Sequence, residues 1–80
     1  MTREEKRNAV VSRCRAVLMI ATKSADERRE RAYNAYGWAR DKMLGMASGF
    51  WAIHELELEE LANYYADVAE HKVRKDLYKK

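Results

Sequence analysis

The chain has 80 residues, which allows one small domain with a limited hydrophobic core. It contains no proline and three glycines and is rich in helix-favouring residues, so we expect an all-α fold. Its single cysteine, Cys14, excludes an internal disulfide framework and a zinc site made of cysteines alone. No stretch approaches the ~20 apolar residues of a membrane span, so we expect a cytoplasmic protein that does not enter a membrane.

The net charge of +3 is distributed unevenly along the chain. Residues 1–45 carry 11 Lys and Arg against 6 acids, and residues 72–80 carry 5 against 1. Residues 46–71 carry 6 acids and no Lys or Arg. Segregated charge can steer an asymmetric partner, and it is equally compatible with the solvent-exposed faces of a bundle. Both interpretations stay open at this point.

The first helix is predicted over about residues 3–22. Thr2 and Glu5 have the spacing of a capping box, which would begin this helix. Val10 and Cys14 belong to an apolar stripe at helical spacing. This position favours a small buried side chain for Cys14 over a reactive thiol or an intermolecular disulfide. The basic flank of the helix is more typical of a solvated face than of a nucleic-acid contact.

The second helix is predicted over about residues 25–47, after a turn at residues 22–24. Ser24 would begin it with a second capping box. A heptad seam follows, with small side chains at most early positions and larger ones later: Ala25, Arg29, Ala32, Tyr36, Ala39, Met43 and Met46. Alanine at these positions would let another helix approach closely.

The third helix, predicted over about residues 50–74, holds the densest run of large apolar side chains. The preceding break is expected at residues 46–49, where Ser and Gly favour a turn. In a continuous helix Glu57 projects into the apolar face and Leu56 points away from it. A kink or a restart near Leu56 is therefore the alternative. The basic tail, residues 75–80, is expected to fray.

These elements predict a small three-helix bundle, in which the first two helices form an antiparallel hairpin and the third packs across it. The alanine seam and the aromatic stripe exceed what one small chain is expected to bury, so we also expect a homodimer. A set of aromatic, apolar and acidic side chains is predicted to form the dimer or partner interface: Tyr36, Met43, Trp51, Glu57, Glu60, Tyr64 and Tyr65. The acids would be its polar rim, and Tyr64 is expected to point outward.

No arrangement for catalysis, metal binding or a cofactor is recognisable. His54 and His71 are seventeen residues apart, and HELEL lacks the second histidine of an HExxH zinc motif. We expect His54 to lie in the core or in an interface. The clustered glutamates follow one helix rather than facing each other across a cleft. We therefore expect neither an enzyme nor a bound cofactor.

Short motifs in the third helix resemble a known family. Glu55-Leu56, Glu60-Leu61-Ala62, Tyr64-Tyr65 and Glu70-His71-Lys72 are similar to the third-helix region of the small Hha-type nucleoid modulators. That family consists of helical proteins that act by binding a DNA-binding partner. The resemblance covers a short part of the chain and requires a one-residue insertion before His71, and the upstream helices are longer. The chain is therefore not assigned to the family.

The sequence favours a non-enzymatic protein-interaction module that regulates or inhibits a larger macromolecule, of the kind common among phage and plasmid accessory proteins. The alternative is a nucleic-acid-associated protein, or a nucleoid-modulator-like adaptor, that uses the basic faces of the first two helices. Arg28, Arg31 and Arg40 are its candidate nucleic-acid contacts. A steep loss of nucleic-acid binding with salt would distinguish this alternative.

Overall fold

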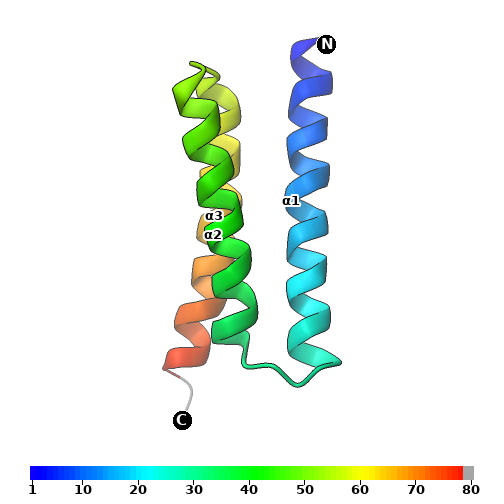
Figure 1. Cartoon of the computed structure of the whole chain (residues 1–80), viewed down its shortest axis with the longest axis vertical. Coiled ribbons are helices and arrows are strands. Elements are labelled where there is room, and N and C mark those ends of the chain that lie inside the picture. Colours follow the sequence, from blue (N-terminus) through cyan, green and yellow to red (C-terminus); the bar gives the residue numbers. More distant parts are fainter. Residues whose placement is uncertain (79–80) are drawn as a thin grey trace.

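The computed structural model describes residues 1–78 and confirms the predicted all-α three-helix bundle. The helices are α1 (Arg3–Asp26), α2 (Ala32–Ala52) and α3 (Leu56–Leu77). They run side by side along the long axis of a molecule that measures 44 × 20 × 14 Å, as Figure 1 shows. Among the described residues, no helix has the length and apolar character to cross a bilayer.

The start of α1 matches its prediction, whereas its end does not. The Thr2 hydroxyl accepts the Glu5 amide at 3.1 Å, and the Glu5 carboxylate accepts the Thr2 amide at 3.4 Å, which confirms the capping box. The predicted turn at residues 22–24 is wrong, because α1 continues through Ser24. Serine and threonine favour caps but are also tolerated within helices, where a hydroxyl can bond the carbonyl four residues earlier. The Thr22 hydroxyl makes this bond at 2.9 Å.

The chain reverses instead between α1 and α2, over residues 27–31. Arg29 adopts a left-handed conformation with φ of 54°, and the Glu30 amide donates to the Ser24 carbonyl at 3.1 Å. Consequently α2 begins at Ala32 rather than near residue 25.

The predicted break at residues 46–49 is also wrong, because α2 continues past Gly49 to Ala52. A Schellman motif ends it: the Glu55 amide donates to the Phe50 carbonyl at 2.9 Å, and the His54 amide donates to the Trp51 carbonyl at 3.1 Å. The position that usually holds glycine is His54, with φ of 61°. Gly49 therefore did not mark the end of the helix, although glycine is common at such ends.

The alternative of a restart near Leu56 is confirmed, since α3 begins at that residue. Phe50 and Trp51, which were expected to begin the third helix, belong to α2. The run of large apolar residues is thus divided between two helices and the corner that joins them. At the other end, α3 reaches Leu77, beyond the predicted end at residue 74. Residues 79–80 of the predicted basic tail lie outside the described residues.

The closest pair in the bundle is α2 and α3, rather than the first two helices expected to form the hairpin. Figure 1 shows these two helices close together and α1 standing farther away. Six buried alanines lie on α2 and α3: Ala35, Ala39, Ala47, Ala62, Ala66 and Ala69. Small side chains let helix backbones approach closely, which explains the short separation.

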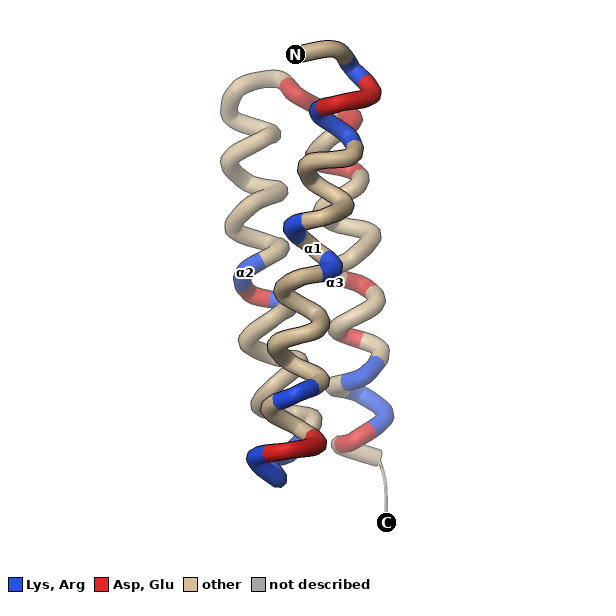
Figure 2. The backbone as a smooth tube through the Cα atoms, turned by 90° about the vertical axis from the view of Figure 1, so that its right-hand side faces the viewer, with Lys and Arg blue, Asp and Glu red and all other residues tan. Residues whose placement is uncertain are grey.

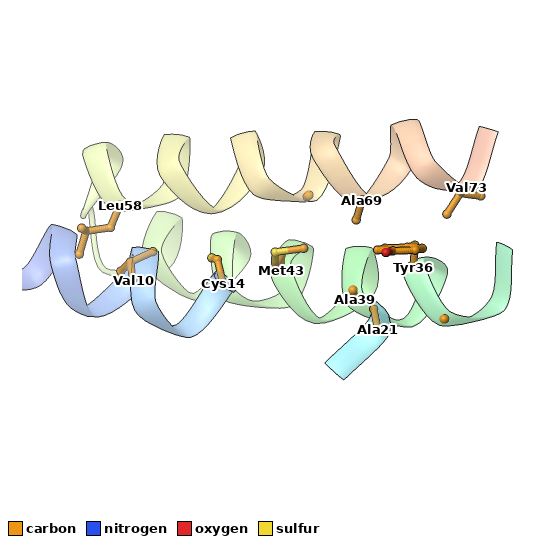
Figure 3. Close-up of a cluster of buried hydrophobic side chains, with 11 residues drawn as sticks. Val10, Cys14, Ala21, Tyr36, Ala39, Met43, Leu58, Ala69 and Val73 are labelled. Carbon is orange, nitrogen blue, oxygen red and sulfur yellow. The ribbon is translucent and has the colours of Figure 1, made fainter. Parts of the chain in front are cut away.

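The core runs along the bundle from Leu58 and Val10 at one end, past Met43, to Tyr36 and Val73 at the other (Figure 3). Met43 is fully buried, and the Tyr36 hydroxyl lies 2.7 Å from the Thr22 hydroxyl of α1. The part of the predicted seam from Ala32 to Met46 is therefore core within one chain, whereas Ala25 lies in α1 and Arg29 is exposed in the connection. Tyr36 and Met43 were predicted as interface residues, and the structure buries both inside this core instead.

Cys14 is fully buried in the same cluster, which confirms that it serves as a small core side chain. Burial raises the pKa of its thiol, because the thiolate would lose its hydration. A neutral, enclosed thiol is poorly suited to disulfide formation or nucleophilic chemistry.

Candidate interaction surface

Four large apolar side chains are exposed near the connection between α2 and α3. The exposed fractions are 45% for Leu44, 64% for Trp51, 66% for Ile53 and 54% for Leu56. We call these four residues the corner surface. Leu44 and Trp51 are seven residues apart on α2, so they lie on one side of that helix, two turns from each other.

The corner surface faces away from α1. The groove between α1 and α2 is lined on the α2 side by Trp38, Lys42 and Met46. At about 100° per residue, Leu44 lies roughly 200° around α2 from Lys42 and about 160° from Met46. Figure 1 shows α1 on the right of the α2–α3 pair and no described helix on its left. Leu44, with Trp51 on the same side of α2, therefore lies on an uncovered face of the α2–α3 pair, which we call the open face.

At this end of the molecule α2 and α3 contribute no Lys or Arg, because none occurs between Met43 and His71. In Figure 2 the corresponding half of α2 carries no charge, and α3 beside it carries only acidic positions until its last turns. Residues 43–54 contain no charged side chain at all. In the half of the α2–α3 pair nearest its connection, α2 is thus uncharged and α3 is acidic.

The first acids of this half are neutralised by α1. The Glu57 carboxylate accepts from Arg3 at 2.6 Å and from Arg7 at 2.5 Å, and Lys6 donates to Glu55 at 2.9 Å. The hydrogen bonds from Arg3 and Arg7 lower the pKa of Glu57. Glu57 was predicted as part of a partner rim, and the structure instead makes it an intramolecular anchor for α1.

Three acids of α3 form no ion pair within residues 1–78: Glu59, which accepts a hydrogen bond from Asn63 at 3.3 Å, and two others that remain for an external partner. Glu60 and Asp67 are exposed and form no ion pair within residues 1–78. They lie seven residues apart, on the side of α3 that also carries Leu56 and Asn63. We call Glu60 and Asp67 the acidic rim. Glu60 thus stays a candidate rim residue, as the sequence predicted, and Asp67 joins it.

The other half of the open face is closed by ion pairs. Arg40 of α2 donates to Glu70 of α3 at 2.5 Å, and Arg74 donates to the same carboxylate at 3.2 Å. The hydrogen bonds from Arg40 and Arg74 lower the pKa of Glu70. Nearer the chain reversal, the backbone amide of Tyr33 donates to Asp76 at 2.8 Å. Ion pairs and a backbone hydrogen bond therefore bridge α2 and α3 in this half, although Tyr33 and Leu77 are also exposed there.

The predicted aromatic interface residues have different environments. Trp51 is exposed in the corner surface, and Tyr64 is exposed on α3, which confirms that Tyr64 points outward. Tyr65 is half-buried against the core, with its ring centroid 5.2 Å from that of Tyr64. His54, expected in the core or an interface, is exposed at the corner because the Schellman motif turns the chain there.

The three predicted nucleic-acid contacts do not form one free basic surface. Arg28 is exposed in the connection after α1. Arg31 lies 3.4 Å from Asp76, and Arg40 is bound to Glu70. Two of the three guanidinium groups thus already bind carboxylates of the same chain.

Sequence reasoning missed Leu44, Ile53 and the exposed setting of Leu56. A usable signal was present, since twelve consecutive residues without charge, 43–54, must leave an uncharged face exposed unless every side is covered. The misplaced break at residues 46–49 concealed it, because it divided this run between two helices.

Comparison with known proteins adds no relative: no family model, no curated protein and no solved structure matches the chain. The short resemblance to Hha-type modulators is therefore not accompanied by a match to any family model.

Proposed function

We propose that this protein is a non-enzymatic interaction module that regulates or inhibits a larger protein partner by docking it on the corner surface. The observation that supports this most is the exposure of four large apolar side chains near the α2–α3 connection: Leu44, Trp51, Ile53 and Leu56. A contiguous group of large exposed apolar side chains is typical of protein-binding sites. Tryptophan is also among the residues most enriched at binding hot spots.

The composition of the core supports the same proposal. Met43 and Cys14 are fully buried without any contribution from the corner surface. Burial of Leu44 and Trp51 is therefore not required to complete the interior of this chain. Their apolar character needs another explanation, and a docked partner supplies one.

The homodimer expected from the sequence stays a prediction. One reason for it was the alanine seam of α2, which a single chain buries by itself. Its other reason, surplus aromatic surface, persists in Trp51 and Tyr64. Sedimentation over a range of concentrations measures whether a second copy covers them.

The nucleic-acid alternative has less support from the geometry. Arg31 and Arg40 are engaged by carboxylates, and the acidic rim would repel phosphate groups near the corner surface. The positive charge left to this alternative is Arg28 together with Arg13, Arg15 and Lys23 of α1, which are exposed and form no ion pair within residues 1–78. A binding assay with duplex and single-stranded DNA at low salt would separate the two functions, and we expect no saturable binding.

The experiment that tests the proposal compares captured proteins between matched variants. Tagged wild-type protein, the double variant Leu44→Gln/Trp51→Ala and the control Met19→Gln/Tyr78→Ala are used to capture partners from lysate of the native host. All four substituted residues are exposed, so melting temperatures should stay close to wild type. We expect a stoichiometric partner to be retained by wild type and control and lost by the corner variant. An unchanged set of captured proteins across all three would contradict the proposal.

A further inference from the structure

We infer that the corner surface and the acidic rim together bind a basic amphipathic helix of a partner protein, which lies along the open face of α2 and α3. This inference rests on the proposed function and specifies the chemistry of the partner. It depends on the charge of the open face, on its exposed apolar side chains and on the way in which α1 binds the opposite face.

The chain contains its own example of such a helix. α1 packs against the α2–α3 pair with an apolar stripe that includes Val10 and Cys14. Its first two turns supply Arg3, Lys6 and Arg7 to acids at the start of α3. The pair thus already binds one basic amphipathic helix, on the face shown toward the viewer in Figure 2.

The open face offers the same combination of groups without an intramolecular ligand. Leu44 and Trp51 of α2 and Leu56 of α3 supply apolar contacts, all of them exposed. Glu60 and Asp67 supply two carboxylates on one side of α3. Their seven-residue spacing corresponds to about 10 Å along the helix axis, which matches two cationic side chains two turns apart on a docked helix.

A helix is the form of ligand that fits this site. Two adjacent helices present a groove that accepts the apolar stripe of a third, with anchors at three- and four-residue spacing. A helix docked there would complete a four-helix arrangement around the alanine-rich α2–α3 pair. A β-strand ligand would find no sheet edge among the described residues, which are helical or lie in connections.

Charge decides between the possible occupants. In a two-fold dimer whose axis passes through the acidic rim, this rim would lie against the acidic rim of the second copy. Repulsion between carboxylates opposes that pairing. A nucleic acid would bring phosphates toward Glu60 and Asp67 and meets the same repulsion. A cationic helix is attracted by the acidic rim and can bury Trp51.

The test uses three synthetic peptides of about 18 residues, long enough to span roughly 27 Å as a helix. The first has a leucine stripe flanked by lysines, the second replaces every lysine with glutamate, and the third keeps the composition of the first but scrambles the stripe. Each is labelled with a fluorophore and titrated with the full chain while anisotropy is recorded at low and at moderate salt.

We expect saturable binding of the lysine peptide alone. Leu44→Gln/Trp51→Ala should weaken it by about tenfold or more, as expected for loss of a central anchor. Glu60→Gln/Asp67→Asn should weaken it several-fold at low salt and flatten its salt dependence. The control Glu4→Gln/Glu30→Gln removes the same charge from exposed positions outside the site and should bind as wild type does.

Three outcomes would overturn the inference. Equal binding of the lysine and glutamate peptides would show that the acidic rim takes no part. Equal weakening by the rim and control variants would show a response to net charge alone. Self-association that Leu44→Arg abolishes would assign the corner surface to a second copy. If a host protein is still lost specifically from the Leu44→Gln/Trp51→Ala variant while no basic helix binds, the proposed function stands and only this ligand class is rejected.

Discussion

The α2–α3 pair and the docking of α1 on it are built from different residues. The α2–α3 interface contains alanines on both helices, including Ala39 and Ala66, and the two helices are the closest in the bundle. α1 stands farther away and buries only Val10, Cys14 and Ala21. It is also fixed at its first turns by ion pairs to Glu55 and Glu57.

This difference shows how one small chain can combine two kinds of helix packing: a tight α2–α3 interface and a less specific contact with α1. Close helix packing through alanine depends on shape and tolerates little change. α1 is held by a few apolar residues and by exposed ion pairs. Other basic amphipathic helices can make contacts of the same type. The structure uses the second kind of contact for α1, and we propose that it offers the same kind of contact to a partner.

The largest effect is expected from a charge placed in the tight interface. Ala39 is fully buried, so Ala39→Glu would place an unpaired carboxylate in the core. This should lower the free energy of unfolding by about 3–5 kcal/mol or prevent folding. Ala16→Glu, at an exposed position of α1, is the matched control and should change stability by less than ~0.5 kcal/mol. Urea unfolding followed by circular dichroism measures both. Equal stability of the two variants would remove Ala39 from the core.

A smaller contrast is expected when alanine is enlarged. Ala62→Leu should cost about 1–3 kcal/mol, because the close approach of α2 and α3 leaves no room for three more carbons. Ala25→Leu faces a hollow of about 570 Å³ between the end of α1 and the neighbouring parts of α2 and α3. Filling part of it should be neutral or stabilise by up to ~1 kcal/mol. If thermal unfolding shows Ala25→Leu to be less stable than Ala62→Leu, the description of a tight α2–α3 pair and a loosely docked α1 is contradicted.

The ion pairs of α1 should make its docking sensitive to pH. The pKa of Glu57 is lowered in the folded chain by the hydrogen bonds from Arg3 and Arg7, so the unfolded chain binds a proton at higher pH than the folded one. The stabilising contribution is complete above the ordinary glutamate pKa of about 4.3 and is lost as pH falls through the lowered value.

Replacing this carboxylate should therefore flatten the acid limb of the stability profile. We expect the free energy of unfolding of Glu57→Gln to fall less than that of wild type as pH is lowered through the glutamate range. Glu60→Gln removes an exposed acid that makes no ion pair within residues 1–78, and its profile should follow wild type. A Glu57→Gln profile parallel to wild type would show that these bonds do not hold α1.

The smallest effects on stability are expected on the open face and the outer side of α3. Trp51→Ala and Tyr64→Ala should each change the free energy of unfolding by less than about 0.5 kcal/mol, because both side chains are exposed. Tyr65→Ala removes a ring packed against the core and should cost more than either. Losses of several kcal/mol at Trp51 would place it in the core and remove it from the proposed surface.

The sequence predicted the helix content, the capping box at Thr2 and the buried stripe through Cys14 because these depend on local spacing. It misplaced both connections, because Ser24 and Gly49 carry turn preferences that tertiary packing overrides here. His54 in a left-handed conformation was not predictable, since glycine and asparagine are the usual residues at that position.

The interface prediction shows the same division between local and tertiary information. Residue type alone identified Trp51 and Tyr64 as surface candidates, and both are exposed. The same argument failed for Tyr36 and Met43, because burial is decided by which helix packs against which side. Glu57 became an internal partner of Arg3 and Arg7, and a contact between residues about 50 positions apart cannot be read from sequence spacing.

Native-state hydrogen exchange, resolved by residue, tests the central difference between the two interfaces most directly. We expect amides of buried α1 residues such as Val10 and Cys14 to exchange through an opening of lower free energy than those of Ala39 and Ala66. Added salt should widen the gap, because it screens the ion pairs of α1. Equal protection in all three helices, unchanged by salt, would show one cooperative unit and would contradict a rigid α2–α3 pair carrying a separately docked helix.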